Sequence, residues 1–180
     1  MALFSDSIET FDDLFAGVLK NVYYAERQIT EALPKMIDKA TSPELRAGFE
    51  QHLQETRGQI GRLERVFQMR DIEAEEATCP AIDGIIKAGN TMAGEIDDKP
   101  VLDAALIAAA QLVEHYEIAQ YGTLIAWARQ MGRGDCADLL EQTLQEEKST
   151  DQKLTRIAES RINRAAEQES MNAGSSSQYV

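Results

Sequence analysis

Apolar residues recur every three to four positions along four long stretches of the chain, the spacing that puts them on one buried helix face. The first stretch follows Thr10, which we expect to be an N-cap. Its periodicity continues past Pro34, which we expect to kink the last turns rather than end them. The run Thr41-Ser42-Pro43-Glu44 then closes this helix and starts the next, because a capping residue precedes a proline at the first helical position. We expect the second helix to end near Met69.

The third stretch, from Pro100 to about Met131, is apolar on nearly every side, which is typical of a helix at the centre of a fold. Gly132-Arg133-Gly134 should end it. We expect Asp135 to cap a fourth helix that runs to about Ala166. No run of alternating β-branched residues predicts a strand.

The connection over residues 70–100 has a weaker pattern, although Ile82, Ile85, Ile86 and Met92 predict one short helix within it. Short links make neighbouring helices antiparallel, whereas a link of about 30 residues can cross a bundle from end to end. We therefore expect an all-α fold, a four-helix bundle with one long crossover that contains a short extra helix. We assign this domain to residues 1–166 and a disordered tail, rich in serine, to residues 167–180.

The chain has 31 acidic and 18 basic residues and a formal charge of -13, which disfavours nucleic acid and anionic membrane surfaces as partners. No apolar run approaches the roughly 20 residues that span a bilayer, and the N-terminus does not resemble a secretory signal. The two cysteines, Cys79 and Cys136, are not in a CxxC motif, so we expect reduced thiols in a cytoplasmic protein.

Several acidic residues fall on apolar helix faces rather than on solvated ones. An α-helix turns by about 100° per residue, and with this geometry the acids that point inward are Glu26, Glu114, Glu117 and Glu147. On the second helix, His52 and Gln59 also point inward, and Glu55 lies at the edge of that face. Asp151 lies one turn beyond Glu147.

Burying ionised carboxylates costs several kcal/mol each unless they take up protons, pair with cations or bind metal. The nearby cations are expected to project outward: Lys20, Arg27, Lys35, Arg57 and Lys148. Two divalent metal ions bridged by glutamates would neutralise the cluster. Taken singly, an inward glutamate also fits an oligomer interface, and His52 fits a hydrogen-bonded core histidine. The nearby tyrosines fit either core packing or a hydrogen bond to a carboxylate: Tyr23, Tyr24, Tyr116 and Tyr121.

Four segments carry a resemblance to a known family: Tyr-Tyr-Ala-Glu at 23–26, HLQETRGQ at 52–59, AALIAAAQLVEHYEIAQYGTL at 104–124 and LLEQTLQEEKSTDQKL at 139–154. Over residues 8–165 the chain resembles the ferritin-like superfamily, and within it the YciF-type bacterial stress proteins. The resemblance implies a ferritin-like bundle, a homodimer and a carboxylate-bridged dimetal site. It implies iron, with manganese or another divalent ion as the alternative.

Ferritin-like carboxylate proteins place one Glu on the first helix, Glu-x-x-His on the second and fourth, and one or two Glu on the third. Glu26, the pair Glu114 and Glu117, and Glu147 match this pattern. The histidines do not, because Gly58 and Thr150 stand three residues after Glu55 and Glu147. Gln59 and Asp151, one position further, are possible substitutes on the same face, and His52 offers the one inward imidazole.

The resemblance implies that the metal centre oxidises Fe(II) or reduces peroxide in a stress response. The missing histidines weaken the case for catalysis more than the case for metal binding, so no catalytic residue is assigned. The alternative is a non-catalytic, homodimeric helical binding module whose buried acids are a degenerate metal site. Storage of metal in a protein shell is a third hypothesis, although no part of the sequence specifies a cage.

Overall fold

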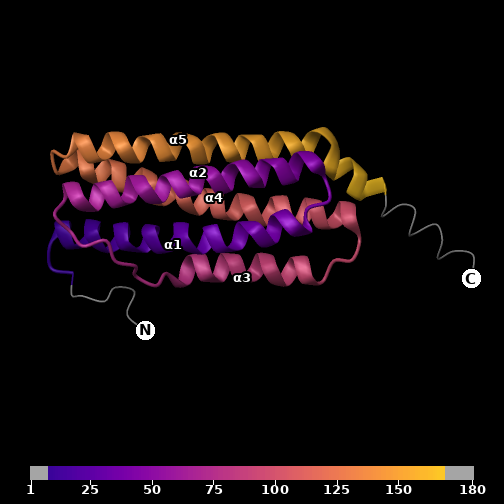
Figure 1. The fold of residues 1–180 in the computed structure, drawn as a ribbon, viewed down its shortest axis with the longest axis horizontal. Helices are drawn as coiled ribbons and strands as arrows, with labels where there is room; N and C mark the ends of the chain where they lie inside the picture. The colour runs from indigo at the N-terminus through magenta and orange to yellow at the C-terminus, as the bar shows by residue number, and fades with distance from the viewer. Residues whose placement is uncertain (1–7, 169–180) are drawn as a thin grey trace, which may run out of the picture.

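The computed structural model describes residues 8–168. Over this range the chain forms helices and no strand (Figure 1). The helices are α1 (Phe11–Lys39), α2 (Pro43–Met69), α3 (Pro80–Gly94), α4 (Lys99–Gln130) and α5 (Gly134–Ile157). The expected all-α class, the four long helices and the short helix in the crossover are confirmed.

Local signals in the sequence set most of the helix boundaries. Thr10 and Asp13 form a capping box at the start of α1, and α1 continues through Pro34. At the start of α2, the Ser42 hydroxyl accepts a hydrogen bond from the backbone N–H of Leu45, with proline at the next position. Asp98 caps α4 in the same way.

The predicted cap of the fourth long helix is wrong. Arg133 rather than Asp135 occupies the N-cap of α5, and Gly132 makes the turn before it with a φ of 71°. Asp135 lies within the first helical turn, where its carboxylate accepts hydrogen bonds of 3.0 and 2.9 Å from the Arg133 guanidinium. The acid therefore sits near the positive end of the helix dipole and pairs with a side chain instead of capping the backbone.

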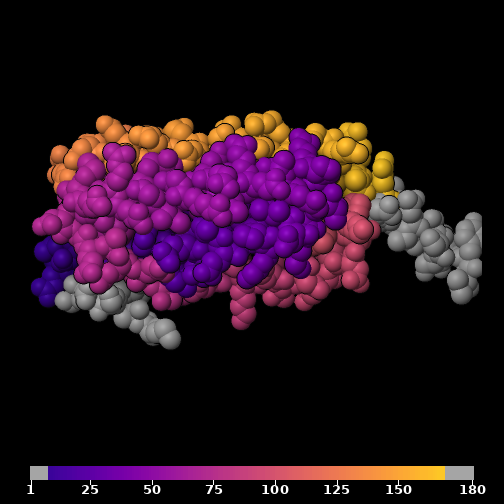
Figure 2. Space-filling view, in the orientation of Figure 1, coloured from indigo at the N-terminus to yellow at the C-terminus, as the bar shows by residue number. Residues whose placement is uncertain are grey.

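The crossover sets the direction of the helices. Residues 70–98 run from one end of the bundle to the other, so α2 and α4 are parallel, while α1 with α2 and α4 with α5 form antiparallel pairs (Figure 1). α2 packs on α5, α1 packs on α4, and α3 lies outside the bundle against α4 and α1. Side chains of α1, α2 and α5 cover the face shown in the space-filling view (Figure 2). The single long crossover is thereby confirmed.

The hydrophobic core consists of two halves. One contains Leu33, Leu45, Leu106 and Ile157, and the other contains Phe15, Phe67, Leu124 and Leu140. Every long helix contributes to both halves. Between them, each of the four helices carries buried polar residues, and these form the polar band: Glu26, His52, Thr56, Gln59, Glu114, Glu117, Thr143 and Glu147.

The end of the last helix contains a feature that periodicity does not predict. After α5 the chain forms one turn of π-helix, Ala158–Ile162, before it returns to α-helix over residues 163–168. The wider turn leaves both Ala158 and Ile162 buried against the core. Helix continues two residues past the predicted boundary at 166, and the rest of the predicted tail lies outside the described residues.

Two further expectations concern the cysteines and membrane-spanning segments. Both Cys79 and Cys136 are buried free thiols, as predicted. Among residues 8–168, no helix combines the length and the apolar character that crossing a bilayer requires.

The turn between α1 and α2 is fastened to α4 by one buried carboxylate. Asp103 accepts hydrogen bonds from the backbone N–H groups of Thr41 and Ser42, each 2.8 Å long, and a third of 2.7 Å from the Thr41 hydroxyl. This contact fixes the end of the bundle at which the crossover enters α4.

We expect Asp103→Ala to lower the free energy of unfolding by about 2–4 kcal/mol, because it leaves three donors without their charged acceptor. Urea denaturation followed by circular dichroism measures the change. The exposed Asp138→Ala on α5 is the matched control and should change stability by less than about 0.5 kcal/mol. Equal stability of the two variants would contradict the role given to Asp103.

Candidate metal centre

All four long helices supply a side chain to the centre of the polar band. Glu26 comes from α1, His52 from α2, Glu114 and Glu117 from α4, and Glu147 from α5. Each is at most 4% exposed. Glu114 and Glu117 share a helix face because residues three apart lie one above the other. The predicted inward orientation of these residues is confirmed.

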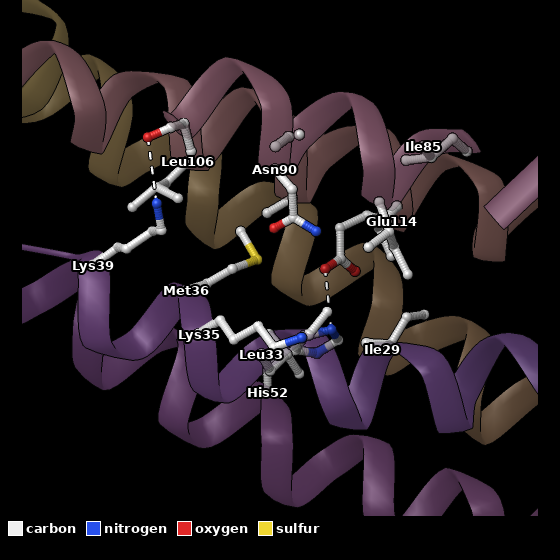
Figure 3. Close-up of a pocket in the computed structure, with 17 residues that line it drawn as sticks. Ile29, Leu33, Lys35, Met36, Lys39, His52, Ile85, Asn90, Leu106 and Glu114 are labelled. Carbon is white, nitrogen blue, oxygen red and sulfur yellow. Dashed lines mark hydrogen bonds and ion pairs between the residues drawn. The ribbon is translucent and has the colours of Figure 1, made fainter. Parts of the chain in front are cut away.

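Four of these side chains converge on one point. His52, Glu114, Glu117 and Glu147 each offer an oxygen or nitrogen atom, and the four atoms lie within 4.8 Å of one another. His52 Nε2 is 3.2 Å from Glu114 Oε1, and Figure 3 shows the two side chains pointing toward each other. We call this group the four-residue cluster.

Glu26 adjoins the four-residue cluster from the α1 side. Its carboxyl group lies close enough to those of Glu117 and Glu147 for the groups to act on one another electrostatically. The Tyr121 hydroxyl donates a hydrogen bond to Glu26 Oε1. Tyr121 therefore fulfils the expectation that a nearby tyrosine orients a carboxylate. The other three bond elsewhere: Tyr23 to Glu64, Tyr24 to Asp83 and Tyr116 to Cys79.

Several buried atoms of this group lack hydrogen-bond partners within residues 8–168. They are Glu26 Oε2, Glu114 Oε2, both oxygens of Glu117, Glu147 Oε2, Gln59 Oε1 and both ring nitrogens of His52. Buried polar atoms are normally paired, and leaving one unpaired costs about 1–3 kcal/mol. Carboxylate oxygens and an imidazole nitrogen are also the usual ligands of divalent metals. The residues present therefore fit a metal site.

Burial also determines the protonation of the centre. Desolvation raises the pKa of Glu26, Glu114 and Glu117 well above its usual range, and repulsion between the carboxylates adds to the effect. Desolvation also raises the pKa of Glu147, to about 7. Desolvation lowers the pKa of His52 to about 4, so its imidazole is neutral at physiological pH. A neutral imidazole is the form that binds metal.

Gln59 connects the centre to the surface between α2 and α5. Its amide group donates hydrogen bonds to Glu147 and, over 3.1 Å, to Glu146 Oε2. Arg62 pairs with Glu146, and its Nε donates a 2.9 Å hydrogen bond to Thr143. The Arg62 charge opposes the rise in the pKa of Glu26.

Arg62 was not identified from the sequence as a residue near the centre. Its position three residues after Gln59 places it on the same face of α2, and this spacing was the available signal.

Two predicted ligands lie outside the group. Glu55 is partly exposed and accepts a 2.7 Å hydrogen bond from Gln51. Asp151 is also partly exposed and accepts a 3.0 Å hydrogen bond from Gln111. Both lie near enough to act electrostatically, Glu55 on Glu147 and Asp151 on Glu114. The structure thus brings together Glu26, His52, Glu114, Glu117 and Glu147, with Gln59 beside them.

Metal-free protein should lose stability as the pH rises. A glutamate in the unfolded chain ionises near pH 4.5, whereas folded Glu147 keeps its proton to about pH 7. The folded state therefore binds more protons in this window. The contribution is complete below about pH 4.5 and is lost as the pH rises through 7, on the order of 3 kcal/mol for Glu147. We expect the Tm of EDTA-treated protein to fall with rising pH, and to fall less in Glu147→Gln.

His52 acts in the opposite direction, because its lowered pKa removes stability as the pH falls from 6.5 through 4. Because His52 is present in wild type and in Glu147→Gln alike, the difference between their slopes from about pH 4.5 to 7 reports Glu147. The exposed Glu50→Gln on α2 is the control and should keep the wild-type slope. A Glu147→Gln slope equal to that of wild type would contradict the assignment.

Known proteins share this fold. A family model described as "Domain of unknown function (DUF892)" matches residues 10–167. Protein YciF of Escherichia coli (strain K12) is 43% identical over 162 residues, which cover 89% of this chain and 98% of YciF. The crystal structure of the E. coli stress protein YciF matches with a TM-score of 0.83 over 87% of this chain and 99% of that chain, at 43% identity.

Two further solved structures extend the comparison. YcfI from Rhodopseudomonas palustris matches with a TM-score of 0.82 and 53% identity over 84% of this chain and 97% of that chain. A Xanthomonas campestris protein matches at 22% identity with a TM-score of 0.70, over 89% of this chain and 98% of that chain, and supports the fold alone. The ferritin-like architecture and the expected family are confirmed, and the chain belongs to the DUF892 (YciF) family.

Proposed function

We propose that this protein binds two divalent metal ions, which we expect to be iron, at the centre of its bundle. The ligands in this proposal are His52, Glu26, Glu114, Glu117 and Glu147. The observation that carries the proposal is the convergence of buried carboxylate oxygens and imidazole nitrogens that have no hydrogen-bond partner in the described chain.

Metal accounts for these atoms better than protons alone. Protonation can neutralise the carboxyls, but it leaves several of their oxygens and His52 Nδ1 without hydrogen-bond partners in the described chain. Arg62 lies at the rim, where it pairs with Glu146. An oxygen-rich shell with one imidazole suits Fe(II), a borderline ion, and Mn(II), a hard one.

In such a site, bound Fe(II) would supply electrons to dioxygen or peroxide and would itself be oxidised to Fe(III). The chain's own residues would orient the ligands and exclude water. Tyr121 holds Glu26 and Gln59 holds Glu147 by hydrogen bonds. The two apolar core halves close the centre at both ends. Because E. coli YciF is described as a stress protein, we propose a role in a stress response for this chain as well. The buried free thiols support a cytoplasmic location.

We expect wild-type protein, loaded with Fe(II) without oxygen and then desalted, to retain about two irons per chain, as a dimetal carboxylate site would. Metal content is measured by mass spectrometry. The double variant Glu114→Gln/Glu147→Gln keeps side-chain volume but removes two anionic ligands, so it should lose most of the iron.

Glu50→Gln is the matched control for this experiment, since Glu50 is an exposed residue of α2, and it should bind iron as wild type does. Circular dichroism checks that every variant is folded. Folded wild-type protein that retains neither Fe(II) nor Mn(II) would contradict the proposal. It would favour the non-catalytic binding module instead.

We also propose that the protein forms a homodimer through the outer face of α4. Leu112 is 55% exposed on this helix. The exposed residues Ala108 and Ala119 lie on the same face, four residues before it and seven after it. Leu112 thus stands between two small apolar residues that would let a second helix approach closely, with the exposed His115 beside them.

We expect Leu112→Arg to convert the dimer to a monomer of unchanged helix content, because it places a charge in the apolar contact. Analytical ultracentrifugation measures the mass. Lys87→Ala, at an exposed site on α3, should leave the mass unchanged. A Leu112→Arg variant that remains dimeric would place the interface elsewhere.

A further inference from the structure

An apolar pocket between α1, α3 and α4 ends at one side of the candidate metal centre. Of its lining residues, labelled in Figure 3, His52 and Glu114 are buried and mark its inner end, whereas Lys35, Lys39 and Asn90 are exposed and mark its mouth. The walls between them are apolar, and the largest wall residues are Ile29, Leu33, Met36, Ile85, Ile86 and Leu106. We call this pocket the apolar passage.

The volume of the apolar passage limits what it can hold. It is about 40 Å³, which is room for about three water-sized molecules and too little for an acyl chain, an aromatic ring or a sugar. Gly89 of α3 shows how closely the outer wall is packed, because a Cβ at this residue would lie 2.9 Å from Ala109 Cβ on α4. The enclosed part of the passage therefore fits a molecule of two or three heavy atoms.

The lining of the passage selects among such molecules. Water and hydrogen peroxide lose hydrogen bonds between the apolar walls, whereas an apolar diatomic loses none. The inner end carries unpartnered polar atoms, since neither His52 ring nitrogen nor Glu114 Oε2 has a hydrogen-bond partner within the described chain. Because the buried His52 and Glu114 close the inner end, a small apolar molecule in the passage would lie beside the proposed metal ligands.

We propose that the apolar passage binds dioxygen and leads it to the His52 and Glu114 side of the centre. The delivery of dioxygen to metal rests on the function proposed above, but the occupancy of the passage does not. The crossover helix α3 gains a role in this proposal, because without Ile85, Ile86 and Gly89 the passage would be an open groove on α1 and α4.

The test uses metal-free protein, so that failure of the metal proposal and failure of this one are distinguishable. Dissolved dioxygen is paramagnetic and speeds the NMR relaxation of nearby methyl groups. We expect several-fold larger enhancement at Leu33 and Leu106, in the passage, than at Leu63 and Leu140, which are equally buried in the other core half. Equal enhancement at the four residues would overturn the proposal.

Two variants of α1, each with phenylalanine in place of an alanine, test whether dioxygen enters through the passage. Ala32 lines the passage and is partly exposed, so Ala32→Phe should fill it and abolish the extra relaxation at Leu33 and Leu106. Ala16→Phe, at a partly exposed site of α1 outside the passage, is the control and should leave the enhancement unchanged.

An Ala32→Phe variant that folds, by circular dichroism, and keeps the wild-type enhancement would overturn the route. A second arm uses xenon, an apolar atom of similar size, in pressurised crystals of the metal-free protein. Xenon density in the passage of wild type but not of Ala32→Phe would support the proposal. Absence of xenon from both would show a passage closed to apolar gas and overturn it.

Discussion

The burial of mutually repelling carboxylates is the constraint on which the rest of this structure depends. Glu26, Glu114, Glu117 and Glu147 face one another from three helices, and His52 completes the group from a fourth. Such a group can persist only if something neutralises it, since several uncompensated buried charges would exceed the net stability of a domain this size. Hydrogen bonds from Tyr121 and Gln59 and the charge of Arg62 stabilise part of this group. The atoms that remain unpartnered make metal the best-supported occupant.

Much of the fold follows from the sequence because its signals are local. Helix periodicity, proline after Ser42 and a capping box at Thr10 act within a few residues, so the limits of four long helices could be predicted closely. The inward direction of Glu26 and Glu147 follows from helix geometry alone. Asp135 does not cap the helix, because its carboxylate pairs with Arg133, two residues earlier. The N-cap preference of aspartate, on which the prediction was based, takes no account of such a pairing.

The parts that could not be predicted depend on distances across the bundle. Glu55 and Asp151 lie close to the inward faces of their helices, yet both are partly exposed at the rim, where Gln51 and Gln111 bind them. The anchoring of the α1–α2 turn by Asp103 joins residues about 60 positions apart, and no local pattern marks it. The apolar passage arises where three helices leave a gap, and its outer wall exists only because α3 docks on α1 and α4.

The division of the core into two halves has a consequence for cooperativity. Each long helix runs from one apolar half to the other through the polar band. The two halves are therefore joined by a layer that contributes little hydrophobic stabilisation. Because a layer with few buried apolar contacts has low local stability, it favours opening of one half without the other. A ligand bound in the band would join all four helices at their midpoints, so that occupancy would govern whether the bundle opens as a single unit or one end at a time.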